Sequence, residues 1–64
     1  MVTVEEMKNS VGHKTRILFS SGRFEETFVE SYEYEPDEDE EPFILFEYNR
    51  ADYQSNIKRI EILD

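Results

Sequence analysis

Catalytic chemistry in this chain would centre on His13, because it is the only histidine and the sequence contains no cysteine. A nucleophile–base pair would need this imidazole beside a serine and an orienting carboxylate, and the candidates are Ser20, Ser21, Ser31 and Ser55. Acidic residues are so frequent that a neighbouring carboxylate carries no information. The two glycines also exclude a glycine-rich phosphate loop. We therefore expect that this protein is not an enzyme, and we assign no catalytic or cofactor-binding residue.

The acidic residues suggest a different kind of site, because they gather in one stretch. The net charge is −9, and seven of the sixteen acids lie between positions 33 and 41: Glu33, Glu35, Asp37, Glu38, Asp39, Glu40 and Glu41. The rest of the chain is nearly neutral. Pro36 and Pro42 bracket five consecutive acids, and like charges repel one another. We expect an extended, mobile loop over residues 35–42.

Alternating acids in this loop resemble the start of a calcium-binding loop. Asp37, Asp39 and Glu41 have that spacing. Pro42 stands where such a loop needs glycine, and Tyr48 stands where it needs a bidentate glutamate. No metal site is predicted.

A β-hairpin is the element around which the chain is organised. Residues 14–20 and 23–34 are rich in β-branched and aromatic side chains, and Ser21-Gly22 separates them. The second run is long for one flat strand and lacks clean alternation. A bulge or bend near residues 26–29 would reconcile its pattern.

A short helix is predicted before the hairpin, over residues 4–11. Thr3 and Glu6 have the spacing of a capping box. Gly12 is a suitable residue to end the helix. The apolar stripe that would pack on a sheet consists of Val4, Met7 and Val11.

The remaining sequence predicts three further strands and one helical turn. Residues 43–48 are apolar on both faces, as in a strand covered on two sides. A turn at 49–52, a short strand at 53–55, a helical turn at 56–59 and a closing strand at 60–62 follow. The expected core contains Ile17, Phe19, Phe24, Phe28, Ile44, Phe46, Ile60 and Ile62.

Residues 1–64 are therefore expected to form one mainly-β domain. The segments 16–22, 43–46 and 56–63 resemble those of small Sm-like or SH3-like β-barrels. In these families a short N-terminal helix precedes five strands, the second strand is long and bent, and one helical turn precedes the fifth. The resemblance implies a five-stranded barrel. The RNA-contacting residues of Sm-like proteins are not recognisable here, so RNA binding is not implied.

Two functional hypotheses remain. In the first, the chain is a non-enzymatic protein-interaction module whose open strand edges take a peptide strand or pair with a second copy. In the alternative, the acidic run imitates nucleic-acid phosphates and inhibits a DNA- or RNA-binding protein, as some small phage proteins do. The candidate partner-binding residues are Tyr32, Tyr34, Asp37, Glu38, Asp39, Glu40, Glu41, Tyr48 and Tyr53.

The expected partner is a protein. The seven lysines and arginines are scattered, so direct binding to nucleic acid is not expected. The chain has no apolar run long enough to cross a membrane, and a cytoplasmic location is the default expectation. A small core without disulfides also leaves self-association open.

Overall fold

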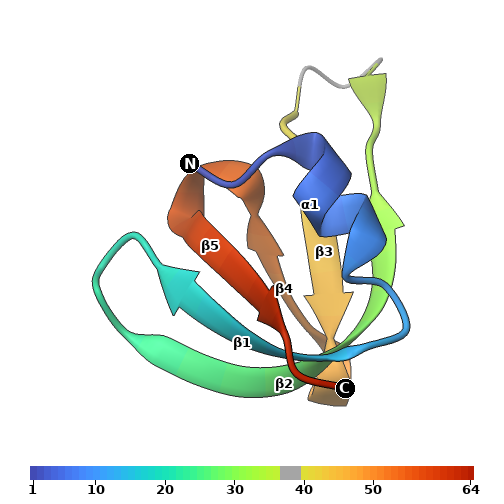
Figure 1. Ribbon diagram of the computed structural model, residues 1–64. Coiled ribbons are helices and arrows are strands. Elements are labelled where there is room, and N and C mark those ends of the chain that lie inside the picture. The colour runs from blue at the N-terminus through green and yellow to red at the C-terminus, as the bar shows by residue number, and fades with distance from the viewer. Residues whose placement is uncertain (37–39) are drawn as a thin grey trace.

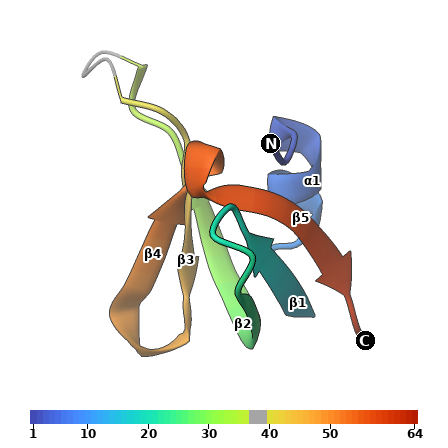
Figure 2. The same cartoon turned by 90° about the vertical axis from the view of Figure 1, so that its left-hand side faces the viewer.

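Five antiparallel strands form the body of the protein (Figure 1). The computed structural model describes residues 1–36 and 40–64. The strands are β1 (Lys14–Phe19), β2 (Phe24–Glu33), β3 (Phe43–Phe46), β4 (Arg50–Tyr53) and β5 (Ile57–Ile62). Their order in the sheet is β4-β3-β2-β1-β5, so β4 and β5 are the edge strands (Figure 2). A mainly-β fold with five strands and one short helix is confirmed.

The bent strand β2 belongs to both halves of the sheet. Its first part pairs with β1, from Phe24 opposite Leu18 to Phe28 opposite Lys14. Its last part pairs with β3, and the register shifts between Val29 and Ser31. The tight turn before β2 places Gly22 at φ 93°, a conformation that glycine adopts without steric cost. The hairpin and the irregularity within its second strand are therefore confirmed, although the shift lies slightly further along the chain than expected.

The helix α1 (Val4–Asn9) begins with the predicted capping box. Thr3 Oγ1 accepts a hydrogen bond from the Glu6 amide at 3.0 Å. The helix ends earlier than predicted, because the Gly12 amide donates to the Val29 carbonyl of β2 at 2.8 Å rather than to a helix carbonyl, and Gly12 has φ 83°. Met7 is buried, whereas Val11 lies beyond the helix and is exposed.

The core lies where the two halves of the sheet meet α1. Its buried side chains are Val2, Met7, Ile17, Phe19, Val29, Ile44, Phe46 and Ile57, with Tyr32 and Ile60 packed against it. Phe19 of β1 contacts Phe46 of β3 edge to face, with ring centroids 6.4 Å apart. This contact joins the two halves of the sheet. The buried hydroxyl of Thr15 donates to the Thr27 carbonyl at 2.8 Å, which satisfies a polar group inside the core.

Three residues of the expected core are exposed instead. Phe24 is 56% exposed and Phe28 is 39% exposed, because the register with β1 points Thr27 and Val29 inward and their even-numbered neighbours outward. Ile62 is 43% exposed, because it lies at the end of an edge strand with one neighbour. The predictions for these three side chains were wrong.

The bounds of the last strands also differ from the predictions. The chain turns at residues 47–49 rather than 49–52, and β4 then begins at Arg50. The single turn before β5 spans Gln54–Asn56, so β5 starts three residues earlier than expected. Along the described residues β4 pairs only with β3, and β5 pairs only with β1, which leaves the sheet open.

Candidate functional site

The backbone of β5 forms one of the two edges of the sheet. The Leu63 amide donates to the Lys14 carbonyl at 2.9 Å, which fixes the alternation along the β1–β5 pair. By that alternation the backbone N–H and C=O groups of Glu61 face β1. The backbone groups of Ile60 and Ile62 face away from β1. No strand of the described chain lies on that side. The edge therefore offers donors and acceptors at two-residue spacing.

The start of β5 is covered by the N-terminus. The Val2 amide donates to the Ile57 carbonyl at 2.9 Å. The Gln54 side-chain amide donates to the Val2 carbonyl at 2.8 Å, which holds this segment in place. The N-terminus therefore lies beside the start of β5 and the C-terminus follows its end, as Figure 1 shows, and residues 60–62 lie beyond the covered start of the strand.

On the β4 edge, the Asp52 side chain occupies one of the outward backbone donors. The Gln54 amide donates to the Pro42 carbonyl, so the backbone groups of Gln54 face β3. Because successive residues alternate, the backbone groups of Ala51 and Tyr53 face outward. Asp52 Oδ1 accepts a hydrogen bond from the Tyr53 amide at 2.9 Å. A second, from the Asn56 side chain at 2.7 Å, fixes the carboxylate. Natural sheets protect their edges with such charged groups, so β4 is a poorer template for a partner strand than β5.

The structure does not bring the four candidate tyrosines into one patch. Tyr32 packs against the core, and the Lys8 ammonium lies 5.4 Å from the centre of its ring. Tyr34 is exposed just beyond β2. Tyr53 packs edge to face on Phe43, with ring centroids 5.6 Å apart. Tyr48 lies at the opposite end of the β3–β4 hairpin from Tyr53 and is the most exposed of the four.

The acidic stretch is only partly described. Asp37, Glu38 and Asp39 lie outside the described residues, so the mobility expected for residues 35–42 stays a prediction. Glu40 is exposed. The Glu41 carboxylate accepts hydrogen bonds from the Ser55 amide at 2.6 Å and from its hydroxyl at 3.0 Å. The last of the five consecutive acids is therefore held against the body of the protein.

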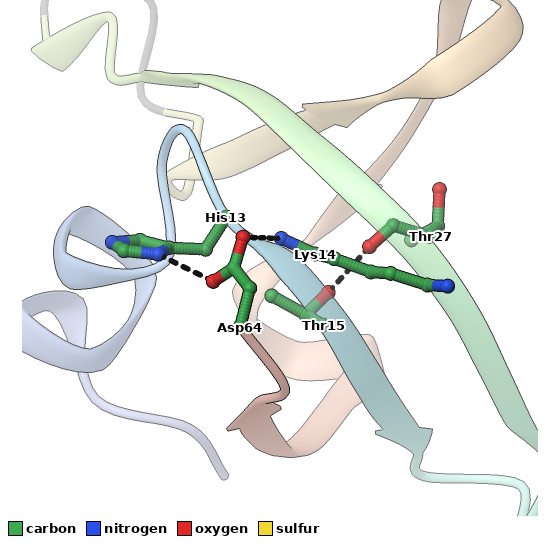
Figure 3. Close-up of polar contacts among 5 residues, drawn as sticks. All are labelled: His13, Lys14, Thr15, Thr27 and Asp64. Carbon is green, nitrogen blue, oxygen red and sulfur yellow. Dashed lines mark hydrogen bonds and ion pairs between the residues drawn. The ribbon is translucent and has the colours of Figure 1, made fainter.

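His13 contacts a carboxylate that the sequence did not single out. Its Nδ1 lies 2.8 Å from Asp64 Oδ1, and the Lys14 amide donates to Asp64 Oδ2 at 3.1 Å (Figure 3). The Lys14 hydrogen bond, followed by the one with His13, holds the pKa of the Asp64 carboxyl below its ordinary value. This pair joins the end of the described chain to the start of β1. No signal in the sequence distinguished Asp64 from the other acids.

Three of the four serines considered as nucleophiles, Ser20, Ser21 and Ser55, make structural hydrogen bonds. Ser20 donates to the Ser55 carbonyl at 2.9 Å, and Ser21 Oγ accepts from the Arg23 amide at 3.4 Å. Ser31 lies within β2 at its register shift. Among the described residues His13 contacts the Asp64 carboxylate and hydrogen-bonds none of the four serines, so no nucleophile–base pair forms around this imidazole.

Over residues 1–36 and 40–64, no three His, Cys, Asp or Glu side chains are grouped to hold a metal ion. The only α-helix in these ranges is too short to cross a membrane. Comparison with protein-family models, with curated proteins and with solved structures found no match to this chain. The functional argument therefore depends on the geometry of the described surface.

Proposed function

We propose that this chain is a non-enzymatic protein-interaction module that binds an extended segment of a partner protein along the β5 edge. The observation that carries the proposal is the open stretch at residues 60–62. There, outward backbone groups are combined with the 43% exposed side chain of Ile62. In strand addition, main-chain hydrogen bonds provide affinity and contacts with alternate side chains provide specificity.

The proposal includes an Sm-like or SH3-like architecture for the five strands. The support is the strand order, the bent β2 that serves both halves of the sheet, and the single turn before β5. β4 and β5 are the two edge strands of the sheet. A second copy of this chain could then supply the added strand as well as a different protein could.

Imitation of nucleic acid is less well supported by the described residues. A phosphate mimic needs carboxylates that are free to enter a basic groove, and the Glu41 carboxylate is occupied by Ser55. Direct binding to DNA or RNA stays unexpected for a chain of net charge −9.

The experiment is selection from a displayed library of random peptides, followed by affinity measurement on two variants. Ile62→Pro removes an outward N–H without breaking the β1–β5 ladder. Ile62→Thr is the matched control, because it shortens the same apolar side chain and keeps the N–H. Loss of one main-chain hydrogen bond should weaken peptide binding about tenfold in Ile62→Pro, beyond any loss in Ile62→Thr. Equal affinities for the two variants, or no selected peptide at all, would contradict strand addition.

A further inference from the structure

The tip of the β3–β4 hairpin holds Tyr48 in a backbone conformation that tyrosine rarely adopts. Its φ is 66° and its ψ is 34°, and Asn49 follows with φ 59°. Positive φ at two consecutive loop residues is favoured by asparagine, aspartate and glycine. A bulky side chain in this region is strained, because its Cβ crowds the following carbonyl oxygen. Hairpin formation alone would therefore favour asparagine or glycine at position 48.

Packing does not explain the tyrosine either. Its side chain is 85% exposed, the largest value among the large hydrophobic residues that the structure describes. The Phe28 backbone amide donates to Glu47 Oε1 at 2.8 Å, which places the backbone of this partly exposed phenylalanine beside the turn. We call Tyr48, Asn49 and Phe28 the tip surface. It combines a strained backbone with an aromatic side chain that is almost fully exposed to solvent.

We propose that Tyr48 is an anchor that inserts into an apolar pocket, with a hydrogen-bonding group at its base, on a partner protein with a basic surface. Strained residues persist where binding or catalysis requires them. Tyrosine is enriched among the few residues that dominate interface energetics, and its hydroxyl seeks a partner when the ring is buried. The net charge of −9, of which residues 33–41 contribute −7, favours long-range encounter with a basic partner rather than a charged contact at the tip itself.

The inference rests on the proposed function in one respect, namely that the partner is a protein. It does not depend on the β5 edge, because the hairpin tip lies next to the other edge strand, β4, at the opposite side of the sheet (Figure 2). A partner could therefore use the tip surface alone, or both surfaces together.

A stability measurement tests the strain. Tyr48→Gly should raise Tm by about 4 °C, because glycine adopts positive φ without the steric cost. Tyr34→Gly is the matched control, because Tyr34 is also exposed but does not have a positive φ. This control should leave Tm unchanged or lower it. A Tyr48→Gly variant that loses as much Tm as Tyr34→Gly would overturn the strain argument and with it the anchor.

A binding measurement tests the anchor. The probe is a displayed library of genomic fragments from the source organism, selected on the wild-type chain, with each clone then measured on the variants. Clones that use the tip surface should bind Tyr48→Gly at least about tenfold more weakly, Tyr48→Phe with a smaller loss, and Tyr34→Gly like wild type. Their affinity should also fall as salt is raised.

The outcomes separate the two proposals. Clones sensitive to Tyr48→Gly but not to Ile62→Pro support the anchor and not the β5 edge, and the reverse pattern supports only the edge. If every clone binds Tyr48→Gly as tightly as wild type, the anchor is wrong. A library that yields no binding clone contradicts both proposals.

Discussion

Burial distinguishes two isoleucines of β5 that look alike in the sequence. Ile57 is fully buried in the core, whereas Ile62 is 43% exposed at the end of the strand. Ile57→Ala should lower the free energy of unfolding by about 2–5 kcal/mol, through lost burial and a residual cavity. Ile62→Ala should cost less than about 1 kcal/mol, because its surroundings are open to water. Chemical denaturation of both variants checks this, and a loss at Ile62 as large as at Ile57 would contradict the core described above.

The Asp64 carboxylate makes one contribution to stability depend on pH. Its folded-state pKa is lowered from 3.8, first by the Lys14 amide and then by His13. A group with a depressed folded pKa stabilises the fold above its unfolded pKa, and this stabilisation is lost as pH falls through the folded value. Wild type should therefore lose more stability than Asp64→Asn as pH falls below about 3.8. A carboxyl pKa at or above 3.8 in an NMR titration would remove this explanation.

Some residue-level features could be predicted because their causes are local. The Thr3–Glu6 capping box and the positive φ of Gly22 depend on a few neighbouring residues. Tyr48 was among the candidate partner-binding residues, but its positive φ could not be predicted, because tyrosine is a common strand residue and the turn was expected one residue later, at 49–52. The contact of His13 with Asp64 joins residues 51 positions apart, so no local pattern could indicate it.

Along β5, alternate residues should tolerate proline very differently. The Glu61 amide faces β1 in the ladder, whereas the Ile62 amide faces outward. Glu61→Pro should lower the free energy of unfolding by about 1–3 kcal/mol, because it removes a ladder hydrogen bond and leaves an acceptor on β1 without its donor. Ile62→Pro should be much milder. Circular dichroism during thermal unfolding measures both, and similar losses would show that the alternation along β5 is wrong.

The inward face of β2 illustrates why element-level prediction was incomplete. Both parities of this strand carry apolar side chains, so periodicity alone cannot decide between Phe28 and Val29. The register with β1 decides in favour of Val29, and the shift before Ser31 then returns Tyr32 to the core side. Strand pairing thus determined which predicted core residues were correct.

For the whole molecule, the pattern of apolar and turn residues predicted the class of fold but not which stretch of the strand edges stays open. Alternating apolar runs and turn residues are sufficient to indicate five strands. Whether the two edge strands meet depends on contacts between distant segments and on the curvature that β2 introduces. The candidate site was therefore missed in part: the sequence placed Ile60 and Ile62 in the core, whereas the structure leaves their backbone groups on an open edge.

Amide hydrogen exchange along β5 tests the central claim most directly. In the dilute, unbound protein, the Ile60 and Ile62 amides should exchange much faster than the Glu61 amide, because they lack a partner strand. A selected peptide should slow exchange at Ile60 and Ile62 while leaving Glu61 unchanged. If self-association supplies the strand, raising the protein concentration should have the same effect. Equal protection of all three amides in the dilute protein, or no change on peptide binding, would contradict the proposal that this module works through its β5 edge.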